Sequence, residues 1–243
     1  MTSAAAQGHG DTEGRPGQGL PGGRVDWSRR ATEPEQLDLG VDEPEARRSL
    51  RDLRFVNRWL GGRRALRRAV LPLLEGREPS LLDVGCGSGD LPALLHGERG
   101  LRVVGLDIKP LHLQQAPRSL RPVAADVRHL PFRPRSFDVV TASLFLHHFD
   151  GDNVAAVLAS LAGVARRALV INDLHRARVP YYFGRLFFPL LFRARVSVAD
   201  GLLSIRRGFK PAELAAAFEQ ARLGPARVER VWPYRLLAIA RLG

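Results

Sequence analysis

The sequence predicts an α/β fold in which a mostly parallel sheet carries helices on both faces. Two observations predict it. From Ser80 onward, short buried strands alternate with helical segments, and the first strand runs directly into the glycine-rich turn Gly85-Cys86-Gly87-Ser88-Gly89. Such alternation is typical of parallel strands joined by crossover helices. The length of 243 residues and the hydrophobic fraction of 45% suit a single globular domain.

Residues 1–40 are expected to form a disordered tail, because glycine, proline, glutamine and scattered charges follow one another there without an apolar period. No apolar stretch near Met1 resembles a secretory signal peptide, and the single cysteine, Cys86, excludes an intramolecular disulfide. We therefore expect a cytoplasmic protein whose main domain spans residues 41–243.

Residues 41–75 open this domain with two helices that we expect to cover the sheet. Apolar residues recur at three- and four-residue spacing with arginines between them, as in an amphipathic helix: Leu50, Leu53, Val56 and Leu60. Gly61-Gly62 ends the first helix, and the second runs from Arg63 to Leu74.

Seven strands and four connecting helices make up the rest of the predicted sheet domain. The strands are expected at residues 80–84, 101–106, 122–125, 137–142, 168–172, 228–231 and 236–240. The helices are expected at residues 90–96, 111–116, 153–165 and 211–221.

Residues 174–209 interrupt the alternation after the fifth strand and are expected to form a helical lid. They hold six aromatic residues between Tyr181 and Phe192 and a net charge of +6. These aromatics either wall an apolar pocket or form a core between extra helices, and both descriptions can hold together. The arginines would then face solvent, an anionic group on the acceptor, or acidic lipid.

The basicity of the chain is mostly arginine. The formal net charge is +12, yet only Lys109 and Lys210 are lysines. Excess arginine beside much alanine, glycine and proline is typical of a GC-rich genome. The charge alone therefore does not indicate a nucleic-acid partner, although a basic chain would ordinarily suggest one.

The glycine-rich turn does not fit a phosphate-binding site. A dinucleotide fingerprint would place Gly or Ala where this chain has Asp90, and the G-x-x-x-x-G-K-[ST] pattern of a P-loop is missing. Asp83 and Asp90 flank the turn and would repel a pyrophosphate, but they favour a ligand that carries positive charge. A nicotinamide-dependent oxidoreductase is opposed by the same residues.

Two further acids follow the next two strands. Asp107 ends the second strand, where a carboxylate can accept from a ribose diol, and Asp126 follows the third, where it can accept from an adenine amino group. With the glycine turn, these acids describe an adenosine site whose remaining substituent is cationic. S-adenosylmethionine fits, because it carries a sulfonium, an ammonium and no phosphate.

Several segments resemble the class I S-adenosylmethionine-dependent methyltransferases. Leu82-Asp83-Val84-Gly85-Cys86-Gly87-Ser88-Gly89 resembles their motif I, and residues 104–108, 125–127, 130–132 and 136–140 resemble the motifs that follow. Ser143-Leu144-Phe145-Leu146-His147-His148-Phe149 is similar to the branch that includes ubiquinone and menaquinone biosynthesis methyltransferases. The resemblance covers residues 79–173 and implies a Rossmann-like, seven-stranded, mostly parallel sheet.

The resemblance also implies roles for individual residues. It places the backbone of Gly85 and Gly87 against the methionine part of the cofactor, with Cys86 inside the same loop and Asp83 near the ammonium. It implies that Asp107 holds the ribose hydroxyls. The remaining implied cofactor contacts are Ile108 packed on adenine, Asp126 and Val127 at its polar edge, and Ser143 beside the methyl-transfer position. No metal ligand set is predicted.

Candidate proton acceptors follow the fourth and fifth strands. His147 and His148 come after the fourth, while Asp173 and His175 come at the end of the fifth. A phenol gains from a positioned base, which is why these four residues are the candidate catalytic groups. The histidines could equally cap a helix or pack under the lid. We rank His148 and His175 above His147, with Asp173 as a base or an orienting group.

The acceptor expected is a small aromatic molecule of the phenol or quinol type, methylated on oxygen, with carbon as the alternative. An RNA methyltransferase that uses the basic flanks is the second hypothesis, although the chain lacks the [DNS]-P-P-[YF] element of amino-methylating enzymes. A non-catalytic S-adenosylmethionine-binding protein is the third. The sequence does not specify the oligomeric state.

Overall fold

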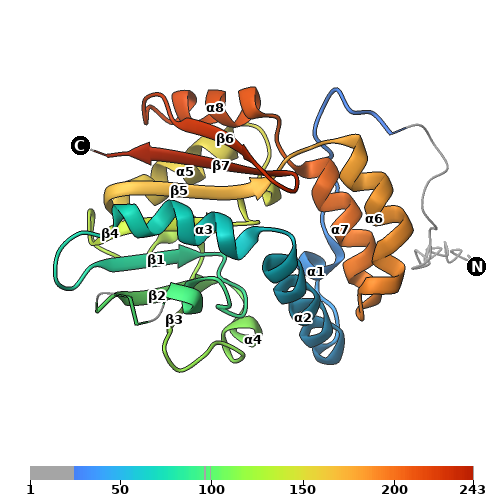
Figure 1. The fold of residues 1–243 in the computed structure, drawn as a ribbon, viewed down its shortest axis with the longest axis horizontal. Coiled ribbons are helices and arrows are strands. Elements are labelled where there is room, and N and C mark those ends of the chain that lie inside the picture. The colour runs from blue at the N-terminus through green and yellow to red at the C-terminus, as the bar shows by residue number, and fades with distance from the viewer. Residues whose placement is uncertain (1–24, 96, 99, 243) are drawn as a thin grey trace, which may run out of the picture.

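The computed structural model describes residues 25–95, 97, 98 and 100–242, and it contains a seven-stranded sheet in the order β3-β2-β1-β4-β5-β7-β6 (Figure 1). All neighbouring pairs are parallel except those made by β7, which is antiparallel to β5 and β6. The predicted α/β class is thus confirmed. The strands are β1 Ser80–Val84, β2 Arg102–Asp107, β3 Arg121–Ala124, β4 Phe137–Ser143, β5 Ala165–Leu174, β6 Arg227–Val231 and β7 Arg235–Arg241.

Helices pack on both faces of the sheet. The α-helices are α1 Gln36–Leu39, α2 Glu43–Trp59, α3 Gly62–Val70, α4 Pro110–Leu113, α5 Asp152–Val164, α6 Arg178–Leu191, α7 Arg195–Arg207 and α8 Pro211–Gln220. Short 3-10 turns are η1 Leu71–Leu73, η2 Pro92–Leu95, η3 Val127–His129 and η4 Leu146–His148. Within the described residues, the helix expected over residues 90–96 is only the short turn η2.

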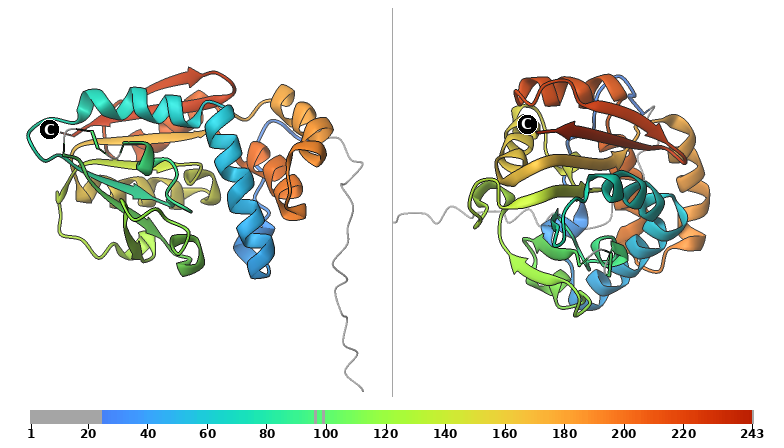
Figure 2. Two further views of the ribbon diagram at one scale, coloured as in Figure 1. Left: turned by 60° about the horizontal axis from the view of Figure 1, so that its bottom comes forward. Right: turned by 60° about the vertical axis from the view of Figure 1, so that its left-hand side comes forward.

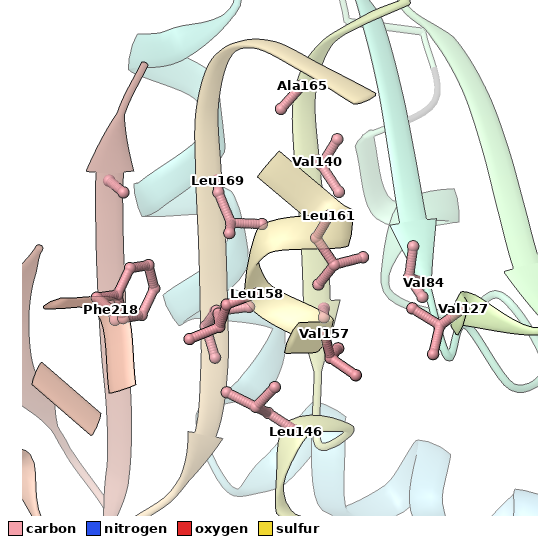
Figure 3. Close-up of a cluster of buried hydrophobic side chains, with 14 of the residues drawn as sticks. Val84, Val127, Val140, Leu146, Val157, Leu158, Leu161, Ala165, Leu169 and Phe218 are labelled. Atoms are coloured by element: carbon pink, nitrogen blue, oxygen red, sulfur yellow. The ribbon is translucent and has the colours of Figure 1, made fainter. Parts of the chain in front are cut away.

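Two apolar cores hold these layers together, one on each face. On one face, Val157, Leu158 and Leu161 of α5 pack on Val140 and Leu169 of the central strands (Figure 3). On the other, α3 buries Leu66 and Val70 against Leu81, Val139 and Val170. Side chains of the central strands point alternately to the two faces, so β1, β4 and β5 each contribute to both cores.

The carboxyl ends of the parallel strands lie together at one edge, beside a group of helices. In Figures 1 and 2, α2 stands between these strand ends and the pair α6–α7. The predicted insertion after β5 therefore forms two helices, which pack on each other beyond the edge of the sheet. No helix in the described part of the chain is both long and apolar enough to cross a membrane.

The structure differs from the expected tail over residues 25–40. Residues 1–24 lie outside the described residues. Beyond them, the guanidinium of Arg30 donates to the carbonyl oxygens of His147, Phe149 and Arg207, and Glu35 is only 5% exposed. The expectation of disorder is wrong here. Polar tertiary contacts order this segment, and such contacts leave no apolar period in the sequence from which order could be predicted.

Candidate active site

A cavity of about 910 Å³ lies at the carboxyl ends of the strands, between the sheet and the surrounding helices. The sheet contributes the glycine turn and the acid that ends β2. Helix α2 contributes Leu50 and Leu53, and α6 contributes Phe183 and Phe188. This volume is near the upper end for small-molecule sites and has room for a nucleoside-sized ligand together with a second ligand.

The glycine turn brings bare backbone to the cavity wall. Gly85 and Gly87 have positive φ angles of 65° and 54°, a conformation that side chains disfavour. A Cβ on Gly85 would also lie 2.2 Å from the ring of Phe145. Only glycine fits at position 85, because the ring of Phe145 occupies the space that a side chain would need.

Asp107 ties this turn to the end of β2. Its Oδ2 accepts from the backbone N–H of Gly87 at 2.8 Å, and its Oδ1 accepts from the N–H of Lys109 at 2.9 Å. His112 lies 3.3 Å from Oδ1. The carboxylate is 7% exposed and lines the cavity, as does the side chain of Ile108, which is 60% exposed.

Six of the predicted cofactor residues line the cavity: Gly85, Gly87, Asp107, Ile108, Asp126 and Val127. Asp126 caps η3 by accepting from the N–H of Arg128 at 2.9 Å, and the Arg128 guanidinium also binds its carboxylate. These hydrogen bonds hold the pKa of Asp126 at about 2, so it faces the cavity as an anion.

Asp83, Cys86 and Ser143 are buried beneath the turn and do not line the cavity. Burial raises the pKa of Asp83 to about 7, and Asp90 and Asp107 add to this effect, against the hydrogen bond that Thr141 donates to it at 2.5 Å. Burial likewise raises the pKa of the Cys86 thiol. Among the described residues, the one hydrogen bond of the Ser143 hydroxyl is accepted from the side-chain amide of Asn172 at 3.5 Å.

His147 is enclosed between two carboxylates. Its Nδ1 donates to Oδ1 of Asp173 at 2.7 Å, and its Nε2 lies 3.4 Å from Oε1 of Glu35. Burial opposes the charged imidazole, but the two carboxylates outweigh it and raise the pKa of His147 to about 10. Asp173 is fully buried in this pair, and the pKa of its carboxyl is lowered by His147 against the effect of burial.

His148 and His175 present their rings to the cavity. His148 stacks on His147 with 4.4 Å between ring centroids and donates from Nδ1 to Asp38 at 2.7 Å. His175 stacks on Tyr234, and its ring nitrogens have no hydrogen-bond partner among the described residues. Burial, with Arg230 and Arg176 nearby, lowers the pKa of His175.

Glu35, His147 and His148 also place ligand atoms within 4.8 Å of one another, close enough to hold a metal ion. Glu35 and Asp173 also pair with His147 through its two ring nitrogens. The contacts are those of an ion-pair network that joins the segment before α1 to η4 and β5.

Three residues of the site were not found from the sequence: Glu35, Asp38 and Arg235. The acids come from the segment assigned to the tail, and the short apolar pair Leu37 and Leu39 is the one local sign that it folds. All three line the cavity. Arg235 begins β7, one residue before the strand expected at residues 236–240.

Arg235 is a buried cation with an unused donor. It is 1% exposed, its Nε donates to the carbonyl oxygen of Leu60 at 2.9 Å, and its Nη2 donates to Asn57 at 3.1 Å. Its Nη1 has no partner among the described residues. Burial lowers the pKa of Arg235 to about 10, with Asp173 and Asp90 opposing, so it stays charged at neutral pH.

Residues 82–168 match the family described as methyltransferase domain. This segment is a methyltransferase domain of the class I S-adenosylmethionine-dependent type. The predicted family and the predicted cofactor, S-adenosylmethionine, are therefore confirmed.

This methyltransferase is similar to proteins of several activities. It is 37% identical over 118 residues to an 18S rRNA (guanine-N(7))-methyltransferase of Mus musculus, covering 46% of this chain and 40% of that one. It is 37% identical over 81 residues to a demethylmenaquinone methyltransferase of Chlorobaculum tepidum, covering 32% and 34%. The chain thus spans less than half the length of these two relatives.

Its fold is also that of solved methyltransferase structures. A Haloferax volcanii methyltransferase in complex with the Trm112 methyltransferase activator superposes with a TM-score of 0.57. The superposition covers 83% of this chain and 99% of that one at 17% identity, a level that establishes the fold alone.

The cavity fits the cofactor of the family. Gly85 and Gly87 present backbone without side chains at its wall, and Arg235 supplies a buried donor without a partner among the described residues. Asp107 and Asp126 add acceptors on the same wall. Bare backbone, one cation and two anions match a zwitterionic amino acid joined to a nucleoside.

Proposed function

We propose that this chain transfers a methyl group from S-adenosylmethionine to a small apolar acceptor of the phenol or quinol type, with oxygen as the favoured atom. The observation that carries the proposal is that one cavity joins the glycine turn and Asp107 to the aromatic side chains of α6. A cofactor and an apolar ring can therefore lie in contact in one enclosed space.

At the sheet end of the cavity, six residues would hold the cofactor. Gly85 and Gly87 would contact its methionine part, whose carboxylate would take the free Nη1 of Arg235. Asp107 would accept from the ribose hydroxyls, and Ile108 and Asp126 would meet the adenine. When bound, S-adenosylmethionine supplies an electrophilic methyl group on a sulfonium.

At the lid end, apolar side chains would hold and align the acceptor. Phe183, Phe188 and Phe192 line this part of the cavity together with Tyr234. Alignment of an acceptor with a transferable group can supply roughly 7–11 kcal/mol of the barrier to reaction. These residues would also keep water from the sulfonium, because few polar atoms lie among them.

His148 would accept the proton of the acceptor hydroxyl. Its Nδ1 is held by Asp38, which leaves Nε2 to take a proton in the cavity. Asp38 has its pKa lowered by His148 against the effect of burial, so it stays an anion that stabilises the imidazolium formed. Transfer to a ring carbon beside the hydroxyl would use the same proton acceptor.

The other candidates have different tasks in this proposal. His147 already carries a proton at neutral pH and so cannot take another, and Asp173 orients it. His175 is neutral and lines the cavity, which makes it the competing proton acceptor. Asp83 would stabilise the turn from below rather than touch the cofactor.

An RNA acceptor is the second candidate, since one relative is named for 18S rRNA and one structural neighbour binds the Trm112 activator. The aromatic lining favours the small acceptor, because a polar, positively charged groove would suit a phosphate backbone better. The proposed location of the reaction is the cytoplasm, and the proposed domain spans residues 41–243, with residues 25–40 packed on it.

The test is a methyl-transfer assay with labelled S-adenosylmethionine against three acceptor sets: phenols and hydroquinones of increasing alkyl length, total RNA, and no acceptor. Incorporation into a hydroquinone or phenol supports the proposal. Incorporation into RNA alone contradicts it. Cofactor binding without transfer to any acceptor would indicate a non-catalytic binding protein.

A further inference from the structure

Helix α6 exposes an apolar face that nothing in the described part of the chain covers. Its buried face holds Tyr181, Gly184 and Phe188, which pack against α7 and Trp27. Large apolar residues on the remaining surface are 37% to 79% exposed: Val179, Tyr182, Phe183, Leu186, Phe187, Leu190 and Leu191. We call these seven residues the α6 face.

The spacing of these residues places them on one side of the helix. At 100° per residue, positions 179, 182, 183, 186, 187 and 190 fall on the side opposite positions 181, 184 and 188. A helix that is apolar on both sides belongs in a buried environment. In a surface helix, such a contiguous patch marks a site of interaction with a protein or a membrane.

Unpaired arginines lie along one border of the α6 face and after its carboxyl end. Arg178, Arg185, Arg193 and Arg195 are exposed, and none of these guanidinium groups lies in an ion pair among the described residues. From Leu174 to Ala199 the sequence contains no Asp or Glu. The charge around the patch is therefore positive and uncompensated, unlike the paired arginines Arg176 and Arg207.

We infer that the α6 face binds the surface of an anionic lipid bilayer, with its apolar side chains in the interface and its arginines against the lipid phosphates. Apolar residues on one side of a helix with arginine at its borders are typical of helices that lie in the membrane interface. A second copy of the chain fits less well. A two-fold contact through this face would bring the arginines of one copy against those of the other.

The position of α6 gives this docking a consequence for the cavity. Val179 and Phe183 belong to the α6 face and also line the cavity, while α6 itself forms the outer edge of the molecule (Figure 1). An apolar acceptor dissolved in the bilayer could enter between these two side chains without crossing water. This consequence rests on the proposed function, whereas lipid binding does not.

The test is co-flotation of the full chain with vesicles of phosphatidylcholine alone or of phosphatidylcholine with about one third phosphatidylglycerol. We expect the partition coefficient onto anionic vesicles to be at least tenfold higher than that onto neutral vesicles. Leu186→Ser/Leu190→Ser and Arg185→Gln/Arg193→Gln should each lower it at least fivefold. Circular dichroism would confirm that the substitutions at these four exposed positions leave the fold intact.

Matched controls remove the same chemistry elsewhere. Leu39→Ser/Trp59→Ser removes two exposed apolar residues of α1 and α2, and Arg118→Gln/Arg133→Gln removes two exposed arginines near β3 and β4. Both should bind vesicles as the unchanged protein does. Equal loss in the controls, absence of binding to anionic vesicles, or a dimer in solution that Leu186→Ser/Leu190→Ser dissociates would overturn the inference. None of these readouts depends on methyl transfer.

Discussion

The backbone N–H of Gly87 donates to the carboxylate of Asp107 at 2.8 Å, and this bond joins the turn after β1 to the end of β2. The two strands are neighbours in parallel register, so their ends lie side by side. One carboxylate oxygen thus fixes the cradle, while the carboxylate still lines the cavity. Asp107 therefore couples the shape of the turn to ligand binding.

Asp107→Ala should weaken the binding of S-adenosylhomocysteine by about 1.5–3 kcal/mol, as expected for the loss of a charged hydrogen-bond acceptor. The product is the suitable probe because it keeps the adenosine and the amino acid and does not react. Calorimetric titration measures the change. Asp152→Ala removes an exposed carboxylate that does not line the cavity, and this variant should bind normally. Unchanged affinity in Asp107→Ala would remove this residue from the site.

Arg235→Lys should weaken S-adenosylhomocysteine binding at least tenfold, because the forked donors of the guanidinium are lost although the positive charge stays. Binding of 5′-methylthioadenosine, which lacks the amino-acid carboxylate, should change by less than twofold. Arg241→Lys, at the exposed end of the same strand, is the matched control. Equal weakening of both ligands would mean that Arg235 supports the fold and does not bind the carboxylate.

The strand-end acids could be predicted from the sequence because strand alternation alone fixes which residues meet at one edge of the sheet. Asp107 and Asp126 reach the cavity for this reason, whereas Ile108 and Val127, which also line it, were predicted from the resemblance. The same logic fails for Asp83, one residue before the end of β1. Its side chain turns beneath the glycine loop toward Thr141, a direction that depends on the neighbouring strand.

Glu35 and Asp38 could not be predicted because local pattern does not encode the contacts that fix them. Their partners, His147 and His148, lie more than 100 positions away in the sequence. Arg235 is comparable, since its partners Asn57 and Leu60 belong to the start of the chain. Polar pairing over such separations has no period, whereas amphipathic helices such as α2 carry one.

The free energy of unfolding should fall as the pH rises toward neutrality, because Asp83 then loses its proton in the folded state. Its pKa in the folded state is about 7 against an ordinary value of 3.8, so the folded state keeps a proton that the unfolded chain releases over this range. The contribution of Asp83 is therefore complete below about pH 4, is lost at up to roughly 1.4 kcal/mol per pH unit, and levels off above about pH 7.

Urea denaturation of the protein and of Asp83→Asn, between about pH 5 and pH 8, measures this contribution. The neutral amide should gain stability relative to the carboxylate as pH rises and stop gaining near pH 7. Other titrating acids, Asp200 among them, are common to both proteins and cancel in the difference. A difference that stays constant with pH would contradict the assignment of the raised pKa to Asp83.

His148→Ala should lower the single-turnover rate of methyl transfer by about 10²–10⁴-fold, the usual contribution of a positioned base, once an acceptor is identified. Affinity for S-adenosylhomocysteine should stay within twofold, because the imidazole would meet the acceptor hydroxyl and not the cofactor. Asp38→Asn should lower the single-turnover rate by a smaller factor, since it would remove the carboxylate that holds Nδ1 of His148.

His175→Ala decides between the two proton acceptors. Its ring also lines the cavity, and its lowered pKa keeps it neutral, so it could replace His148 in the same reaction. If His175→Ala lowers the single-turnover rate and His148→Ala does not, His175 is the proton acceptor. Rates within twofold for both variants would mean that alignment of an acceptor already ionised carries the reaction, without a protein base. In that case the rate should follow ionisation of the acceptor, and acceptors of lower pKa should react faster.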